Sequence, residues 1–237
     1  MKICGFNAVI ESLHAGRVEA LFIRDKRHDG LREIIRLAES QRIPVTQLSE
    51  KELDRVADGQ RHQGVVVSLR PHVMSTISDL VQSSDLPLIV ALDGIEDPHN
   101  FGAIARVAEA AGAAGLIVQT RRAAPLSAAA IRASAGALAH LRLSSVVNLA
   151  RALGELKAAG IWTVGLDVDS DHSIYDIDLR QPTAIVVGSE GRGLRRLVRE
   201  RCDWRAALPM MGRVGSLNAS VATGVALFEA VRQRTRC

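Results

Sequence analysis

Cysteine, lysine and aromatic residues are all scarce in this chain of 237 residues, which holds three cysteines, four lysines and 3% aromatic residues. Cys4, Cys202 and Cys237 are odd in number and scattered, without a C-x-x-C pair. This usage argues against a disulfide framework and a structural zinc site, and it fits a reduced compartment. No apolar run approaches the roughly 20 residues of a membrane span, and the N-terminal residues lack the features of a signal peptide. We therefore expect a cytoplasmic protein with no membrane partner.

Two common nucleotide-binding motifs are also missing. No G-x-G-x-x-G follows the first strand of the larger region, and no G-x-x-x-x-G-K-[ST] phosphate loop occurs. A metal site is not expected either, because Asp93, Glu96, Asp97 and His99 lack ligand spacing and no cysteine or second histidine lies close in sequence. The glycines of interest lie near the C-terminal end.

The composition is that of a globular protein, with 47% hydrophobic and 24% charged residues and a net charge of +4. Arginine supplies 26 of the 30 basic residues. Seven of these arginines lie between residues 190 and 214, and they are Arg192, Arg195, Arg196, Arg199, Arg201, Arg205 and Arg213. Such a cluster favours a phosphate backbone as partner, with a solvated helix face as the alternative.

Residues 1–70 are predicted to form a small α/β domain. Helical patterns cover 7–13 and 31–38, a capping box at Ser49 starts a third helix, and strands are expected at 18–24, 43–48 and 64–69. Residues 71–86 lack a clear period and are predicted to be a linker with at most one helical turn.

Residues 87–237 alternate between apolar strands and helical patterns. Strands are expected at 88–92, 115–118, 161–165 and 183–187, and helices at 102–112, 127–139, 146–159, 194–201 and 219–233. This alternation predicts an α/β fold with a mostly parallel sheet and helices on both faces.

Three segments of this second region run from an apolar strand or loop into a polar, glycine-containing loop and then a helix. The first holds N-x-G-x-x-x-R as Asn100, Gly102 and Arg106. The second holds G-x-E-x-x-G, from Gly188 to Gly193, with Glu190 at its centre. The third is P-M-x-G followed by S-L-N-x-S, and it contains Pro209, Met210, Gly212, Ser216, Leu217, Asn218 and Ser220. Glycine lets the backbone approach a ligand, and Ser and Asn at a helix start can cap the helix or bind a ligand.

These three segments resemble the three motifs of the SpoU/TrmH branch of the SPOUT methyltransferases, which methylate ribose 2′-hydroxyls in RNA. The resemblance covers essentially the whole chain and is strongest to members that modify a guanosine of 23S rRNA. It implies S-adenosylmethionine as cofactor and a deep C-terminal trefoil knot in the 87–237 domain. The segments 4–9 (CGFNAV) and 61–64 (RHQG) resemble the ribosomal-protein-like RNA-binding domain of rRNA-modifying members. Within the latter, we interpret His62 as a hydrogen-bonded structural histidine.

The resemblance also assigns roles to residues. Asn100, Arg106, Glu190, Ser216 and Asn218 are the expected catalytic residues. Arg106 is expected to stabilise alkoxide character on the attacking 2′-hydroxyl, or to grip the adjacent phosphate. A guanidinium group stays protonated in proteins, which makes proton abstraction the weaker account.

The expected cofactor-binding residues are Gly188, Leu208, Met210, Gly212, Leu217 and Asn218. Plainer structural explanations stay open for three of them, because Asn218 can act as a helix cap and Leu208 and Leu217 can belong to the core.

Family members are homodimers, in which the helices that match 102–112 and 219–233 pack against their symmetry mates. The first helix here offers an apolar face of Ile104, Val107, Ala108 and Ala111, and the second offers Val221, Val225 and Phe228. Small residues on the second helix favour a further close contact, and they are Ala219, Ala222, Gly224 and Ala226. Periodicity alone leaves a monomer open.

Two other functions compete with the 23S rRNA enzyme. A tRNA ribose methyltransferase would share the motifs, but the N-terminal domain argues against it. A catalytically silent RNA-binding protein would be expected to lack Asn100, Arg106, Glu190 or Asn218, and all four are present.

Overall fold

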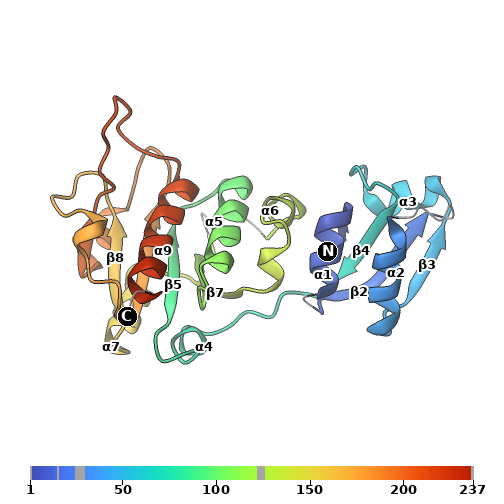
Figure 1. Cartoon of the computed structure of the whole chain (residues 1–237), viewed down its shortest axis with the longest axis horizontal. Helices are drawn as coiled ribbons and strands as arrows, with labels where there is room; N and C mark the ends of the chain where they lie inside the picture. The colour runs from blue at the N-terminus through green and yellow to red at the C-terminus, as the bar shows by residue number, and fades with distance from the viewer. Residues whose placement is uncertain (1, 15, 25–29, 122–125, 236–237) are drawn as a thin grey trace.

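Two β-sheets lie one after the other along the longest axis of the protein (Figure 1). The structure is a computed structural model and describes residues 2–14, 16–24, 30–121 and 126–235. The first sheet is built from the N-terminal quarter of the chain and the second from residues after 87. Cys237 lies outside the described residues.

The first sheet has four strands in the order β1-β4-β2-β3. Their bounds are Lys2–Cys4 (β1), Val18–Arg24 (β2), Val45–Leu48 (β3) and Val65–Leu69 (β4). Strands β2 and β3 are parallel, whereas β4 pairs antiparallel with both β1 and β2. The sheet is therefore mixed, with β4 inserted next to the N-terminal strand.

Helices cover both faces of this first sheet. α1 (Phe6–His14) and α2 (Leu31–Ser40) bury Leu13 and Ile34 against one face. α3 (Glu50–Ala57) buries Leu53 on the other face, against Val66. The predicted capping box is present, since the Ser49 backbone N–H donates to the Glu52 carboxylate at 2.9 Å.

The second sheet has six strands in the order β10-β8-β9-β5-β6-β7. Their bounds are Leu88–Asp93 (β5), Gly115–Gln119 (β6), Arg142–Val146 (β7), Trp162–Leu166 (β8), Thr183–Gly188 (β9) and Trp204–Ala206 (β10). Every neighbouring pair of these strands is parallel, as the alternating pattern predicts. The carboxyl ends of all six therefore meet at one edge of the sheet.

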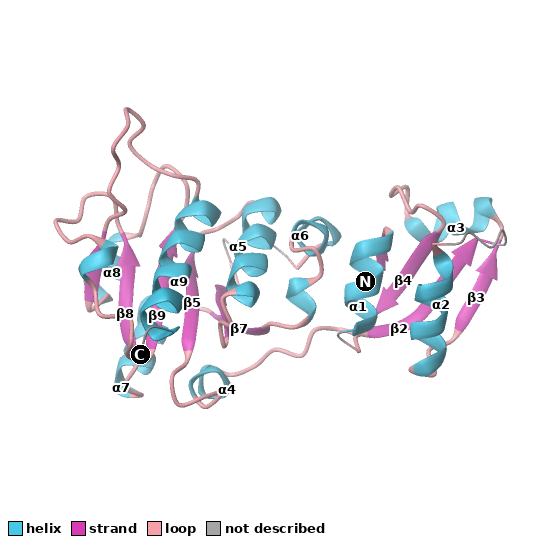
Figure 2. Ribbon diagram, viewed as in Figure 1, coloured by secondary structure: helices cyan, strands magenta, loops and turns pink. Residues whose placement is uncertain are grey.

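Two layers of helices enclose the second sheet (Figure 2). α5 (Pro98–Ala110), α6 (Ala128–Ala133), the 3-10 turns at Ala137–Ala139 and Ile174–Asp176, and α9 (Ala219–Thr235) contribute to the core on one face. α4 (Ile77–Val81), α7 (Leu149–Ala158) and α8 (Arg196–Arg201) cover the other. None of the helices in the described ranges is long and apolar enough to cross a membrane.

Three strands and several helix boundaries differ from the sequence-based expectations. The expected helix 102–112 is α5, which spans Pro98–Ala110. β1 and β10 have only three residues each, and β7 (RLSSV) has three polar residues among its five, so none shows an apolar run. The predicted helix 146–159 begins at Leu149, after Asn148 caps it by accepting the Arg151 N–H at 3.1 Å. The predicted helix 194–201 begins at Arg196.

The predicted helix 127–139 is interrupted at Gly136, which has φ 92°. A Cβ at this position would lie 2.1 Å from Cβ of Glu11 on α1. The break therefore lets α1 approach the second unit, and the Glu11 carboxylate lies 3.5 Å from His140 Nε2 there. Arg132 of α6 also donates to Gln60, so polar contacts join the two sheet-bearing regions.

Candidate active site

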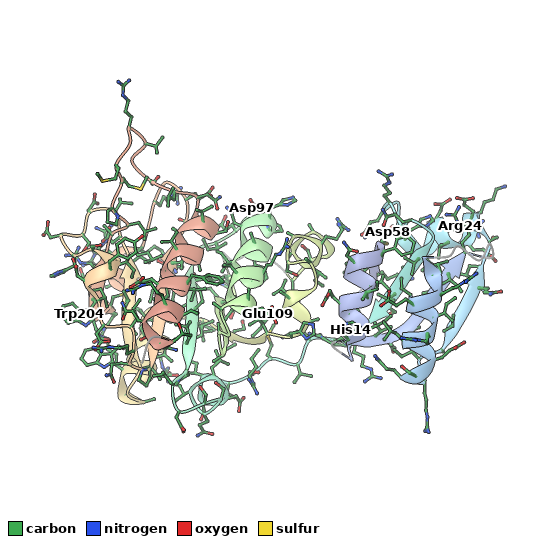
Figure 3. All side chains as sticks on the ribbon, in the orientation of Figure 1. His14, Arg24, Asp58, Asp97, Glu109 and Trp204 are labelled. Atoms are coloured by element: carbon green, nitrogen blue, oxygen red, sulfur yellow. The ribbon has the colours of Figure 1, made fainter. Side chains whose placement is uncertain are left out.

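The loops that carry the three motifs gather at the carboxyl edge of the parallel sheet. β5 leads into the first motif, β9 into the second, and β10 into the third. β5 and β9 are neighbours, and the chain continues from β5 to β6 on the other side. The space between β5 and β9 is thus a switch point in strand order, where α/β proteins place ligands. Figure 3 shows this edge at the Asp97 end of α5, with Glu109 at the far end of that helix.

Asn218 joins all three motifs through its amide. Its Nδ2 donates to Asn100 Oδ1 at 2.9 Å and also to the Glu190 carboxylate. These contacts bridge 118 and 28 residues of sequence. The structure therefore brings Asn100, Glu190 and Asn218 together, although each comes from a different loop.

The same Asn218 side chain caps the N-terminus of α9. Its Oδ1 accepts the backbone N–H of Ser220 at 2.9 Å and of Val221 at 3.4 Å, and the Ser220 hydroxyl at 2.6 Å. The plainer capping interpretation and the site interpretation are thus both satisfied. Because the oxygen binds the helix start, the NH₂ group is turned toward Asn100 and Glu190.

Glu190 lies at the tip of a tight loop. The Gly193 N–H donates to the Ser189 carbonyl at 2.9 Å, which closes the loop on itself. A Cβ at Gly188 would lie 2.2 Å from the Gly193 carbonyl carbon, so only glycine permits this packing. Gly188 is therefore required by the loop's own backbone, besides any contact with a ligand.

A cavity of about 260 Å³ opens beside this cluster. Four of the expected cofactor-binding residues line it, namely Gly188, Leu208, Met210 and Leu217, together with Glu190 and Ser216 from the expected catalytic set. Gly212 and Asn218 are not among the lining residues, although both neighbours of Asn218 are. The wall combines apolar side chains with glycine-rich backbone, as ligand pockets commonly do.

Arg106 lies apart from the group formed by Asn100, Glu190 and Asn218. Its side chain is exposed on α5, and within the described ranges no side-chain hydrogen bond or ion pair involves it. Six residues separate it from Asn100, which corresponds to a rotation of about 240° around the helix. The two side chains therefore leave α5 in different directions, and Arg106 is free to contact something outside this chain.

The arginine cluster divides into held and uncommitted side chains. Arg195 is bound by buried Asp93, while Arg199 and Arg205 lie 3.1 and 3.5 Å from the carboxylate of Asp167. Arg196 pairs with Glu200 at 2.9 Å on the surface of α8. Arg192, Arg201 and Arg213 are exposed and have no such partner among the described residues. Only part of the cluster is therefore available to phosphate groups.

Sequence reasoning missed the loop after β8, where Leu166, Asp167, Val168 and Asp169 line the same cavity. Asp167 is 6% exposed, and its carboxylate accepts the Asp169 N–H at 3.3 Å. The signal available was an acidic pair directly after a predicted strand of a parallel sheet. Its ion pairs fasten this loop to α8 and β10.

Two of the acidic residues considered for a metal, Asp93 and Asp97, have other partners. Asp93 binds Arg195, and Asp97 caps α5 by accepting the His99 N–H at 2.9 Å. No group of three or more His, Cys, Asp or Glu side chains able to hold a metal occurs in the described part of the chain.

Cys4 and Cys202 are poor nucleophiles. Burial raises the pKa of the Cys202 thiol to about 12, and burial also raises the pKa of Cys4. Neither forms a disulfide. Thiolate chemistry therefore has no support at either position.

His62 is a structural histidine, as predicted. It is 8% exposed, and its Nδ1 accepts the Gly64 N–H at 3.0 Å. Nε2 then carries the proton and donates to Asp54 at 2.9 Å. The imidazole thus holds the RHQG segment against α3.

Both sheet-bearing regions of the chain match known protein families. Residues 87–228 match the SpoU rRNA Methylase family, and residues 2–73 match a domain described as RNA 2′-O ribose methyltransferase substrate binding. The 23S rRNA (guanosine-2′-O-)-methyltransferase RlmB of Pseudomonas aeruginosa is 45% identical over 99% of this chain and 97% of its own length. The putative TrmH family tRNA/rRNA methyltransferase YacO of Bacillus subtilis is 41% identical over 98% and 95%.

A solved structure agrees over the full length. The SpoU methyltransferase AviRb from Streptomyces viridochromogenes, crystallised with AdoMet, superimposes with a TM-score of 0.83 and 27% identity. The match covers 100% of this chain and 91% of that one. Sequence and structure agree that the chain belongs to the SpoU rRNA methylase family.

Proposed function

We propose that this protein transfers a methyl group from S-adenosylmethionine to the ribose 2′-hydroxyl of a guanosine in 23S rRNA. The observation that carries the proposal is the junction of three motifs at Asn218, which contacts Asn100 and Glu190 beside the cavity. The near-full-length relative in Pseudomonas aeruginosa bears this activity in its name.

The cavity suits the cofactor in its chemistry. Leu208, Met210 and Leu217 offer apolar contacts for an adenine ring, and the glycine-rich loop around Gly188 offers backbone groups for polar atoms. When bound, the cofactor supplies an electrophilic methyl group on a sulfonium. Glu190 and Ser216, which line the same cavity, belong to the expected catalytic set.

The protein's contribution to the reaction is position and charge. Methyl transfer is an in-line displacement, so the 2′-hydroxyl must be held at near-attack distance and must gain alkoxide character. Arg106 supplies a permanent positive charge for the developing alkoxide, with a grip on the neighbouring phosphate as the alternative. Asn218 donates hydrogen bonds to Glu190 and Asn100, and the ribose is proposed to bind against these three side chains.

RNA binding is divided between two domains in this proposal. Residues 1–70 form a ribosomal-protein-like RNA-binding domain, residues 71–86 a linker, and residues 87–237 the methyltransferase domain with its trefoil knot. The substrate-binding family match over 2–73 supports this division. Within the second domain, the uncommitted Arg192, Arg201 and Arg213 are the first candidates for phosphate contacts.

The active protein is proposed to be a homodimer whose site is completed across the interface. Val221 and Phe228 on α9 are 51% and 48% exposed, which leaves an apolar face to be covered. Arg106 is exposed on the neighbouring helix and has no partner within the described residues, so it is available to a second protomer or to RNA.

Part of the expected interface belongs instead to the core of one protomer. Ile104 and Ala108 on α5 and Ala226 on α9 are fully buried. A Cβ at Gly224 would lie 3.2 Å from Val107 Cγ2, so this small residue serves the packing of α9 against α5 of the same chain. The face around Phe228 therefore remains as the candidate interface.

We place the protein in the cytoplasm, where its free cysteines stay reduced and its rRNA substrate is found. A deletion strain and a transfer assay test the function together. Mapping 2′-O-methyl groups in the strain's rRNA and tRNA should show one missing mark in 23S rRNA. Purified protein with tritiated cofactor should label 23S rRNA from that strain and leave tRNA unlabelled. Labelling of tRNA alone would favour the competing substrate, and no labelling of either would favour a silent RNA-binding protein.

A further inference from the structure

Asp93 is a fully buried carboxylate at the carboxyl end of β5. Its side chain has 0% exposure, yet both of its oxygens are engaged. Oδ2 accepts the backbone N–H of Arg195 at 2.8 Å, and Oδ1 accepts the Arg195 Nε–H at 2.7 Å and an Nη2–H. One aspartate therefore binds both the main chain and the side chain of a residue 102 positions away.

The residue it binds ends the Glu190 loop. Arg195 is the N-cap of α8, with φ −65° and ψ 148°. The loop begins at Gly188, which is paired with Asp93 in the register of β9 against β5. Asp93 thus lies beside the first residue of the loop and is hydrogen-bonded to the last. Between them, the Ser189–Gly193 contact closes the turn that carries Glu190.

The same strand leads to Asn100 only seven residues later. Asn100 and Glu190 both accept a hydrogen bond from Asn218, so their separation is fixed by the loops on which they lie. The Asp93–Arg195 pair is a second link between those two loops, made beneath the cluster. Arg195 is 42% exposed in its side chain, but its Nε and Nη2 groups are directed at Asp93.

We propose that the Asp93–Arg195 pair is a positioning device that holds Glu190 in register with Asn100 and thereby sets the rate of methyl transfer, without touching RNA or cofactor. This inference rests on the proposed function. It assigns Arg195 a role different from the phosphate contacts that its place in the arginine cluster suggests. Misplacing a reacting geometry by about 1 Å can reduce a rate by about 100-fold.

The test uses the full-length protein with three substitutions, Arg195→Gln, Arg195→Lys and Asp93→Asn. Arg195→Gln should lower kcat for 23S rRNA by about 100-fold and leave the KM for RNA and the Kd for S-adenosylmethionine within about threefold of wild type. Arg195→Lys keeps the charge and should recover part of that loss. Arg151→Gln is the matched control, because Arg151 is an exposed arginine outside the arginine cluster, on α7 in the same helix layer as α8, and lies 3.2 Å from Glu155. It should leave kcat unchanged.

A second measurement is independent of activity. Amide hydrogen exchange at residues 189–195 should be faster in Arg195→Gln and Asp93→Asn than in wild type, with the remaining sheet amides unchanged. If the wild-type protein methylates no RNA, the proposed function is wrong. The exchange measurement still shows whether the Asp93–Arg195 pair holds the Glu190 loop in place. A raised KM for RNA with unchanged kcat would identify Arg195 as a phosphate contact and overturn the proposal. Unchanged exchange and unchanged kcat in all three variants would do so as well.

Discussion

The two sheets of this protein use their polar residues in different ways. In the first sheet, which is mixed, the buried polar side chain His62 is satisfied locally, by Asp54 and Gly64 within ten residues of it. In the second sheet, which is parallel, Asp93 and Asn218 reach partners more than 100 residues away. A parallel sheet collects the loops after its strands at one edge, so distant segments can combine there into a site. The first sheet is mixed, so its loops are not all collected at one edge. Its expected role is RNA binding.

The largest effect should follow from substitution at the parallel edge. Arg106→Ala should reduce methyl transfer by about 100- to 1000-fold, because one electrostatic contact to a developing charge is lost. Affinity for S-adenosylmethionine should be nearly unchanged, since Arg106 does not line the cavity. A tritium-transfer assay alongside calorimetry measures both quantities.

Arg151→Ala is the control for that experiment. Arg151 is 82% exposed in its side chain on α7, on the opposite face of the sheet, and its ion pair among the described residues is with Glu155 at 3.2 Å. It should behave as wild type. Unchanged turnover in Arg106→Ala would remove Arg106 from the reaction.

The next largest effect concerns the exposed face of α9. Phe228→Asp should weaken dimerisation by about 100-fold, because about 1 to 2 kcal/mol of apolar contact is lost on each side of a two-fold interface. Sedimentation should then show monomers with little activity. Leu197→Asp serves as control, because Leu197 is 58% exposed but lies on α8, away from this face. A fully active monomer of the wild-type chain would end the dimer proposal.

A deletion addresses the first sheet directly. Removal of residues 1–70 should weaken rRNA binding by at least about tenfold, or about 1.4 kcal/mol, while the remaining chain folds and binds S-adenosylmethionine. Binding of the full chain should fall with salt at a slope of about −0.7 per neutralised phosphate on single-stranded RNA. If the truncated chain binds and methylates 23S rRNA like the full chain, the first sheet is not the substrate-binding part.

The smallest effect is expected at His72, which follows β4 of the first sheet. Burial, together with the charge of Arg17, lowers the pKa of His72 to about 4. Between pH 6.5 and 4 the unfolded chain therefore binds a proton that the folded chain does not, and stability falls as pH falls. Because His72 is partly exposed and solvent screens the interaction, we expect about 1 kcal/mol. Denaturant unfolding of wild type and His72→Gln at pH 7 and pH 5 measures it, and an equal pH dependence in both would contradict it.

The sequence alone predicted the part of the fold in which apolar strands alternate with helices. Apolar strands followed by helical periods predicted β5, β6, β8 and β9, and the parallel sheet follows from their alternation with helices. The resemblance of the three motifs to a known family also predicted that Asn100, Glu190 and Asn218 would share a site. The structure joins these three by hydrogen bonds, while their roles in the reaction stay a prediction.

Other features depend on tertiary contacts that no local pattern shows. β10 is three residues long and becomes a strand because β8 lies beside it. The helix break at Gly136 depends on Glu11, which is more than 100 residues away. Asp93 and Asp167 were visible as acidic residues after strands, but their arginine partners were hidden within a cluster of similar residues. For the same reason, apolar periodicity could not tell that Ile104 and Ala226 face their own sheet.

Asn218 has one further consequence, which is thermodynamic coupling. Its carbonyl oxygen holds the first turn of α9, and its amide nitrogen holds Glu190 and Asn100. Fraying of that turn and loosening of the three-residue cluster are therefore one event rather than two. Any contact that stabilises the start of α9, whether from a second protomer or from RNA, shifts the same equilibrium toward the ordered cluster. Binding on the surface of the last helix is thus coupled to the order of Asn100 and Glu190.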